Sequence, residues 1–575
     1  MKKLITLLWI FCLTGAYAQI VSPGNGSTFT FQDLASDPSG AVVATSAGYY
    51  RLSQDLTLSA SDTLVIDAAT KELFINNTLT ITIHGCVVCA PRTDTLLVTS
   101  NISNCNGDFY DIRIDNADSC VFTDIHFEYG NNILITQSEA TFERCEFSFF
   151  SEQCIKYINA SPVIEHCFFH DNQQAAISSG ANVTGSPVIR HNEFVRNVRN
   201  NVNQPQINLG PGIAGDTIVI EYNHIDGFAH MSGGIAIANL LNISNTVAII
   251  RYNVVENNRY GYTQNGTNIF AIIEDNEFKN NNLETNPLNG GSGISIYGNN
   301  TTCAAKMRRN LVTGNLWGVT AIYYHALDMG TADDWGYNCI YNNANGGTSY
   351  ALFNNAFSDM TAVGNFWGSN DSTDAEEVIF HYADSTIYGE VSYLPVLEIE
   401  PDILAFSVWY NNEEEAVFCF SEQGDTLLFY AECVAPPLCN VVPTITMPLW
   451  VSCSPDPSEP QCFLDHPVVY TLTTPDGRSK DWVVAVILGG DVEDFEPLLV
   501  SVSPNPATFG QIMLHNDFGQ EIFVEVFTLS GQRVYANGCS AGQTVISTSA
   551  WGNGTYLLKA SKGNRSRTFK VIVNN

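Results

Sequence analysis

The sequence predicts an all-β protein whose main part is a solenoid of stacked strands. A short motif recurs every roughly 27 residues, from Ile125-His126-Phe127 to Asn365-Phe366-Trp367, and a fixed period of this length is typical of repeats that stack on one another. Apolar residues lie three positions before each motif and two positions after its first residue, which is the alternation of a half-buried strand. Each copy is therefore expected to add one coil to a common core.

Asparagine recurs at two fixed places of this repeat. It is the first residue of most later copies, and it recurs five positions further on. Asparagine tolerates turn backbone, and stacked copies can bond amide to amide, so two columns of Asn are expected inside turns. The first column is Asn192, Asn223, Asn253, Asn276, Asn310, Asn338 and Asn365, and the second is Asn172, Asn197, Asn258, Asn281, Asn315, Asn343 and Asn370.

A further column, two positions before the motif, alternates in charge from one copy to the next. Opposite charges on neighbouring strands attract, so we expect these side chains to form lateral ion pairs. The members are Glu165, Arg190, Glu221, Arg251, Glu274 and Arg308.

The repeat resembles the right-handed parallel β-helix repeats of the pectate-lyase-like superfamily. Residues 49–83 resemble the N-terminal coils of such proteins, and residues 364–369 resemble a motif that often closes the repeat. The resemblance implies a β-helix, which we place at residues 19–398. It also implies a site in a groove on one parallel sheet, walled by loops.

The N-terminus predicts export. Met1-Lys2-Lys3, an apolar run from 4 to 13 and Ala16-Tyr17-Ala18 have the order of a secretory signal peptide, which we place at residues 1–18. No later stretch reaches the roughly 18 apolar residues of a membrane helix. A net charge of −34 excludes nucleic acids as a class of partner, because phosphate affinity comes from basic side chains. Divalent cations and neutral glycans suit such a surface better.

Two further domains are predicted after the solenoid. In residues 399–490 the Asn columns are absent, and alternating strands around Asp476-Gly477 resemble the end of an immunoglobulin-like β-sandwich. In residues 497–575, Pro504-Asn505-Pro506, a strand running into Ser530-Gly531 and a final basic and apolar strand resemble the type A C-terminal sorting domain of the type IX secretion system. The resemblance implies the type IX machinery as a partner, and release from a Gram-negative cell or attachment to its surface.

Candidate functional residues lie near the interruptions at 282–291 and 325–334. Aromatic side chains there can offer faces to sugar rings, while acids can bind a cation. The alternative is that the rings belong to the core and the acids are solvated. The substrate-binding candidates are Tyr262, Tyr297, Tyr324 and His325, near Trp317, Tyr323 and Trp335, and the metal candidates, with Ca²⁺ as the cofactor, are Asp328, Asp333 and Asp334.

Two classes of function remain open. The first is a surface protein that binds glycan or has a structural or adhesive role. The second is a polysaccharide lyase or glycoside hydrolase that uses paired carboxylates or calcium. Motifs of serine hydrolases, zinc proteases and nucleotide-binding loops are absent from the sequence. We favour the first class, because a lyase of this superfamily needs a free Arg or Lys and the arginine column is expected to be paired. Catalytic residues stay unassigned.

Overall fold

A computed structural model of the 575-residue chain describes residues 19–101, 109–228, 231–286, 289–408, 420–423, 426–431, 439–463, 466–488, 500–508, 510–528, 531–563 and 565–574. The signal peptide predicted for residues 1–18 lies outside them. The chain divides into two compact units, residues 1–397 and 398–575, which are described separately.

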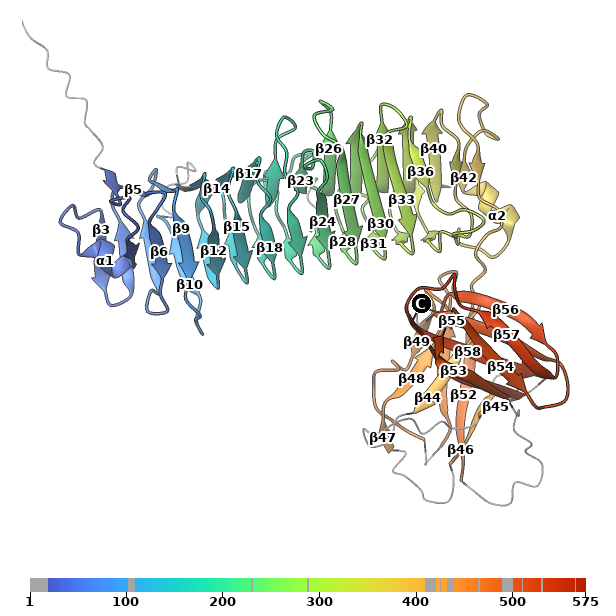
Figure 1. Cartoon of the computed structure of the whole chain (residues 1–575). Coiled ribbons are helices and arrows are strands. Elements are labelled where there is room, and N and C mark those ends of the chain that lie inside the picture. Colours follow the sequence, from blue (N-terminus) through green and yellow to red (C-terminus); the bar gives the residue numbers. More distant parts are fainter. Residues whose placement is uncertain are drawn as a thin grey trace, which may run out of the picture. The chain divides into compact units, whose positions relative to one another are not determined.

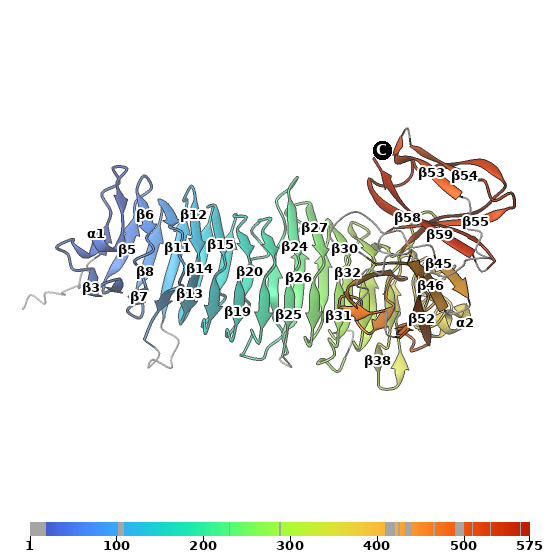
Figure 2. The ribbon, with the colours of Figure 1, turned by 90° about the horizontal axis from the view of Figure 1, so that it is seen from below.

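The first unit is a coil that visits three sheets in turn, here called A, B and C (Figures 1 and 2). Sheet A contains β1 (Gln19–Val21), β5 (Asp55–Leu58), β8 (Thr80–Ile83), β11 (Tyr110–Asp115), β14 (Gly130–Thr136), β17 (Ile155–Ile158), β20 (Ile177–Ser179), β23 (Pro205–Leu209), β26 (Gly233–Asn239), β29 (Tyr262–Gly266), β32 (Ser292–Gly298), β35 (Trp317–Tyr323), β40 (Leu352–Ala356) and β42 (Ile379–Phe380). Sheet B contains β2 (Thr28–Phe29), β6 (Thr63–Ile66), β9 (Cys86–Cys89), β12 (Cys120–Thr123), β15 (Ala140–Glu143), β18 (Val163–Glu165), β21 (Val188–Arg190), β24 (Thr217–Glu221), β27 (Thr246–Arg251), β30 (Ile269–Glu274), β33 (Cys303–Arg308), β36 (Ala326–Asp328), β41 (Met360–Thr361) and β43 (Val391–Ser392). Sheet C contains β3 (Val42–Ser46), β4 (Tyr49–Leu52), β7 (Glu72–Ile75), β10 (Leu96–Thr99), β13 (Ile125–Glu128), β16 (Glu146–Ser148), β19 (Phe168–His170), β22 (Glu193–Val195), β25 (His224–Asp226), β28 (Val254–Glu256), β31 (Glu277–Lys279), β34 (Leu311–Thr313) and β37 (Cys339–Tyr341).

The recurring motif forms the strands of sheet C, in the register that the sequence predicts. His126 pairs with Glu146, Glu146 pairs with Phe168, and the pairing continues coil by coil to Cys339. The apolar residue two positions after the start of each motif points inward. Phe147, Phe169 and Phe194 stack with ring centroids 4.5 and 4.9 Å apart. Burying each such side chain contributes roughly 1.5–3 kcal/mol, so the column forms a continuous core.

The first Asn column closes the corner between sheets B and C. Each buried Asn follows a residue in the left-handed conformation, such as Tyr252 with φ 55° before Asn253. The Nδ2 of Asn253 donates to Oδ1 of Asn276 at 2.9 Å, and the same bond recurs from Asn192 to Asn365. The predicted ladder is confirmed. It offsets the roughly 1 kcal/mol or more that a left-handed non-glycine residue costs in each coil.

The second Asn column closes the corner between sheets C and A, but the coil between those of Asn197 and Asn258 lacks its Asn. There, Gln206, the second residue of β23, supplies the amide. Its Oε1 accepts from Asn197 at 2.9 Å, and its Nε2 donates to Asn258 at 3.1 Å. The ladder then continues through Asn281 and Asn315. Asn370, which the sequence also assigns to this column, is half-buried.

The alternating charge column forms ion pairs across neighbouring coils. Arg190 lies 2.7 Å from Glu165, and Arg251 lies 2.7 Å from Glu221. Arg308 differs from the expectation, because it pairs with Asp328 and Asp334 rather than with Glu274. All three arginines therefore have acidic partners.

Short helices lie at the two ends of the coil. Helix α1 (Phe31–Ala35) begins with a capping box between Thr30 and Asp33 and buries Phe31 and Leu34 in the solenoid core. Helix α2 (Ser372–Glu377) is capped by Asp371 and buries Ala375. Within the described part of the chain, no helix has the length and apolar character to cross a membrane.

The second unit is also built of strands. A hydrophobic core in this unit is formed by side chains of residues 500–574. The predicted hairpin at Asp476-Gly477 is confirmed, with Gly477 at φ 85° between antiparallel β51 and β52. Ser421 pairs with Arg565 and so connects β45 (Phe420–Gln423) with β59 (Arg565–Val573). The strands are β44 (Ala405–Val408), β45 (Phe420–Gln423), β46 (Thr426–Ala431), β47 (Cys439–Val441), β48 (Pro443–Thr446), β49 (Ser452–Ser454), β50 (Gln461–Cys462), β51 (Val468–Thr473), β52 (Ser479–Leu488), β53 (Val500–Thr508), β54 (Gln511–Asn516), β55 (Ile522–Thr528), β56 (Arg533–Cys539), β57 (Gly542–Ser547), β58 (Gly554–Lys562) and β59 (Arg565–Val573).

Candidate functional site

Tyr262 lies inside the coil. Its side chain has no exposed surface, and its hydroxyl donates to Oε1 of Gln264 at 3.2 Å. The ring stands at a position of sheet A that Ile235 and Ile294 occupy on the neighbouring coils. Tyr262 therefore offers no face to a ligand in this structure.

His325 also points inward, and it is 1% exposed. Its Nδ1 accepts from the N–H of Leu327 at 3.2 Å, and its Nε2 lies 3.4 Å from Oδ1 of Asn354. Burial lowers the pKa of His325 to about 4, so the imidazole is neutral at neutral pH. Both ring nitrogens are engaged with the protein interior, which leaves this histidine away from the surface.

Two of the three candidate metal ligands, Asp328 and Asp334, contact an arginine. The guanidinium of Arg308 lies 2.9 Å from Asp328 and 2.8 Å from Asp334, and Lys306 also contacts Asp334 at 2.8 Å. Burial opposes ionisation of Asp334, but hydrogen bonds from Arg308 and Lys306 bring its pKa below the usual value. Asp333 is exposed beside them. Among the residues that the structure describes, no group of three His, Cys, Asp or Glu side chains is placed to hold a metal ion.

Two other predicted residues, Tyr297 and Tyr324, lie at the surface near the C-terminal ends of β32 and β35. Tyr324 is 45% exposed. Tyr297 packs edge-on against exposed Tyr323, with centroids 5.2 Å apart and planes at 90°. A hydrogen bond to Tyr323, together with burial, raises the pKa of Tyr297. These rings, unlike Tyr262, are accessible from outside the coil.

The structure adds rings that sequence reasoning missed. Phe357, which is 51% exposed, lies 5.3 Å from Tyr324 and 6.5 Å from Tyr388 between ring centroids. Tyr388 in turn meets Phe380, which stacks on Phe353 at 4.4 Å. We call this set the aromatic surface; its members are Tyr324, Phe353, Phe357, Phe380 and Tyr388.

Coil register brings these rings together. Tyr323 pairs with Ala356 across β35 and β40, and the N–H of Phe357 donates to the carbonyl of Tyr323 at 2.7 Å. On the next coil, the N–H of Gly389 donates to the carbonyl of Ala356 at 2.8 Å. Tyr324 and Phe357 therefore occupy corresponding points of two successive coils, and Tyr388 directly precedes the corresponding residue of the third, Gly389. The Asn columns alone do not place Phe357 beside Tyr324, because Asn315 and Asn343 are 28 residues apart whereas Tyr324 and Phe357 are 33 residues apart.

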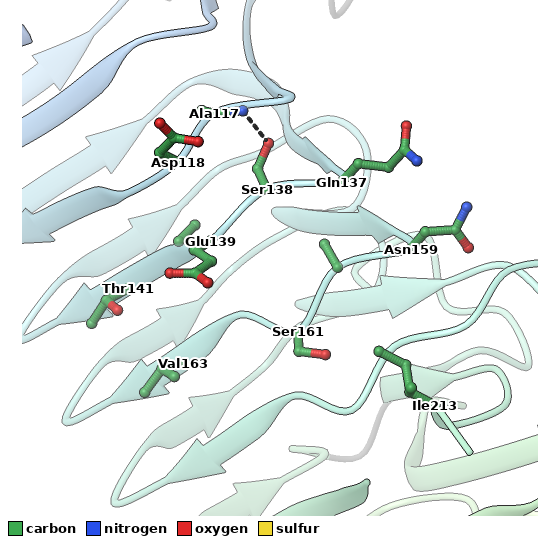
Figure 3. A pocket seen from close by; sticks show the side chains of 12 residues that line it. Ala117, Asp118, Gln137, Ser138, Glu139, Thr141, Asn159, Ser161, Val163 and Ile213 are labelled. Atoms are coloured by element: carbon green, nitrogen blue, oxygen red, sulfur yellow. Dashed lines mark hydrogen bonds between the residues drawn. The ribbon is translucent and has the colours of Figure 1, made fainter. Parts of the chain in front are cut away.

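A separate polar hollow of about 550 Å³ lies at the corner between sheets A and B (Figure 3). Its lining includes the carboxylates of Asp118 and Glu139, and the N–H of Ala117 donates to Oγ of Ser138 at 3.0 Å. Ile213 forms part of its wall. The hollow shares no lining residue with the aromatic surface and contains no aromatic ring.

Comparisons with known proteins agree with this architecture. A family model described as a right-handed beta helix region matches residues 133–329, and a model of the secretion system C-terminal sorting domain matches residues 501–574. The solenoid is a right-handed parallel β-helix, as predicted. The chain carries a type IX sorting domain, which marks the protein for secretion or for the cell surface.

Solved structures similar to this chain include that of the periplasmic alginate epimerase AlgG, with 14% identity, 64% of this chain and 84% of that chain covered, and a TM-score of 0.42. A mutant of the same epimerase gives 13% identity, 64% and 83% coverage, and a TM-score of 0.42. This similarity concerns the fold alone. No curated protein matches the sequence.

Proposed function

We propose that this secreted or surface-located protein binds extracellular glycan on the aromatic surface of its β-helix. One observation carries the proposal: Tyr324 and Phe357 hold exposed rings one coil apart, and their faces are not covered by each other. Their planes are tilted by 44°, and those of Phe357 and Tyr388 by 31°. An apolar face at the surface, bordered by polar groups, is the form of site that sugar rings pack against.

A second exposed series of rings provides a contrast. His166, His191, Tyr222 and Tyr252 stack face to face along the corner between sheets B and C, with centroids 4.7 to 4.9 Å apart and planes within 16°. The two inner rings, His191 and Tyr222, are covered on both faces by their neighbours. Such a stack stabilises the coil, whereas the tilted rings of Tyr324, Phe357 and Tyr388 leave faces free for a ligand.

A binding role is favoured over the lyase or hydrolase alternative by the state of the arginines. A lyase of this fold needs an unpaired basic side chain beside an acid or a calcium ion. Arg190, Arg251 and Arg308 each contact a carboxylate, and removing a proton from a paired guanidinium is still harder than from a free one. We therefore expect no unsaturated product when the protein is incubated with uronate polymers and calcium, as measured by ultraviolet absorbance.

The proposal is tested by binding of the mature protein to immobilised polysaccharides. Tyr324→Ala and Phe357→Ala should each weaken binding by about 2- to 10-fold, since an aromatic contact contributes about 0.5–1.5 kcal/mol. Tyr222→Ala is the matched control, because Tyr222 is equally exposed at 46% but lies in the face-to-face stack. Retention that is unchanged in both surface variants would contradict the proposal.

A further inference from the structure

The charge around the aromatic surface determines which glycans it can accept. Between Arg309 and Arg478 the sequence contains no Lys or Arg, so every fixed side-chain charge on this stretch is negative. The stretch includes Tyr324, Phe357 and Tyr388, and its buried His325 is neutral at neutral pH. No Lys or Arg of this stretch can act as a counter-ion for an anionic ligand.

Two carboxylates follow the rings closely along the chain. Asp359 follows Phe357 by two residues, Glu390 follows Tyr388 by two residues, and both side chains are exposed. They are on neighbouring coils, because the N–H of Glu390 donates to Oδ1 of Asp359 at 2.8 Å and the carbonyl of Glu390 accepts from Met360 at 2.9 Å. Two of the three coils of the aromatic surface, those of Phe357 and Tyr388, thus carry an exposed acid two residues after the ring.

The cations that precede this stretch are already paired. Lys306 and Arg308 contact Asp334, and Arg309 lies 2.7 Å from Asp275 and 3.2 Å from Glu274. A carboxylate of a ligand would have to displace one of these partners to reach a cation. Such pairs neutralise their own charge and do not offset the field of Asp359 and Glu390.

We infer that the aromatic surface is selective for uncharged polysaccharides and rejects polyuronates, with Asp359 and Glu390 as the residues that determine this specificity. The inference rests on the proposed function. Neutral sugars place apolar ring faces on Tyr324 and Phe357 and hydroxyl donors toward the two carboxylates. A uronate would bring like charges together at the same place, and specificity arises from such repulsion as well as from attraction.

The test uses polymers that share a backbone and differ in charge: hydroxyethyl-cellulose against carboxymethyl-cellulose, and methyl-esterified galacturonan against polygalacturonate. Binding of the full mature chain is measured with EDTA, to prevent bridging by divalent cations. The neutral member of each bound pair should bind at least about tenfold tighter at low ionic strength, and the ratio should shrink at 0.5 M salt, where screening is strong.

Charge-neutral variants distinguish a failure of the charge selectivity from a failure of the glycan site itself. Asp359→Asn with Glu390→Gln should reduce the neutral-to-anionic ratio, chiefly by strengthening binding of the anionic polymer, because Asn and Gln keep a hydrogen-bond acceptor but carry no charge. An anionic member that binds as tightly as its neutral partner, and loses binding in Phe357→Ala, would overturn the inference and leave the glycan site standing. No binding of any polymer, or binding that survives both Tyr324→Ala and Phe357→Ala, would overturn the proposed function and the inference with it.

Discussion

Replacing Asn276 by alanine should open the solenoid locally, because this residue occupies the middle of the first Asn ladder. Its Oδ1 accepts from both the backbone N–H and the Nδ2 of Asn253, at 3.0 and 2.9 Å. Its Nδ2 donates to the carbonyl of Ile250 at 2.8 Å and to Oδ1 of Asn310 at 3.0 Å. The side chain is fully buried, so water cannot replace these partners.

The cost follows from which groups lose a partner. In Asn276→Ala the buried N–H of Asn253 loses the acceptor that Asn276 provides, at about 1–3 kcal/mol, and the carbonyl of Ile250 loses a donor worth about 1 kcal/mol. The amide of Asn253 still reaches the carbonyls of Ile220 and Arg251. We therefore expect a destabilisation of about 2–4 kcal/mol. Asn282→Ala is the control, because Asn282 is exposed and its Nδ2 donates a hydrogen bond to the carbonyl of Gly314 at 2.9 Å.

Hydrogen exchange is the appropriate assay, because a solenoid can open one part at a time. Amides of residues 250–280 should exchange roughly 30-fold faster or more in Asn276→Ala than in the parent protein, since 1.4 kcal/mol corresponds to a factor of ten. Asn282→Ala should leave them nearly unchanged. Equal exchange rates in the two variants would refute the ladder as a source of stability.

Three further predictions concern other parts of the chain. Gln206→Ala should destabilise the coil by roughly 2 kcal/mol through the break in the second ladder, whereas Asn203→Ala at an exposed position should not, as denaturant midpoints will show. His325 has a folded-state pKa of about 4 against 6.5 when unfolded, so only the unfolded chain gains the proton as pH falls from 6.5 to 4. Lowering the pH from 6.5 to 4 should therefore reduce the free energy of unfolding of the parent protein by about 3 kcal/mol more than that of His325→Asn. Deleting residues 500–575 should trap folded protein in the periplasm of a host with type IX machinery, and its normal appearance outside the cell would contradict the sorting assignment.

The coil itself could be predicted because its constraints repeat. A side chain that bonds to its own copy on the next coil must recur at the coil spacing, and the Asn columns therefore gave the register of sheet C. The substitution of Gln206 for a missing Asn could not be seen in this way. It comes from strand β23, at a position that has no fixed distance from the motif, although the unfilled amide position between Asn197 and Asn258 is visible in the sequence.

The inward position of Tyr262 was within reach of the same reasoning. Gly261-Tyr262 stands where Gly234-Ile235 and Gly293-Ile294 stand on the neighbouring coils, and those Ile residues are interior. A hydroxyl-bearing ring at an Ile position needs an internal acceptor, which Gln264 provides two residues later on the same face. The alternation of inward and outward side chains along the strand therefore distinguishes Tyr262 from a surface ring. The presence of aromatic residues near a loop does not.

For the acids near residues 328–334, the sequence alone could not predict the binding partner. Whether a carboxylate holds a metal or an arginine depends on which cation the coil brings to it, and Arg308 is on the preceding coil from both Asp328 and Asp334. The arginine is almost completely buried, so two carboxylates are needed to hold its charge there at all. Asp328 and Asp334 are therefore paired with the arginine. The negative charge of this end of the β-helix that has no cationic partner among the described residues is carried by acids such as Asp359 and Glu390. The charge that a ligand meets on the aromatic surface is set by the acids that remain after the internal ion pairs have formed.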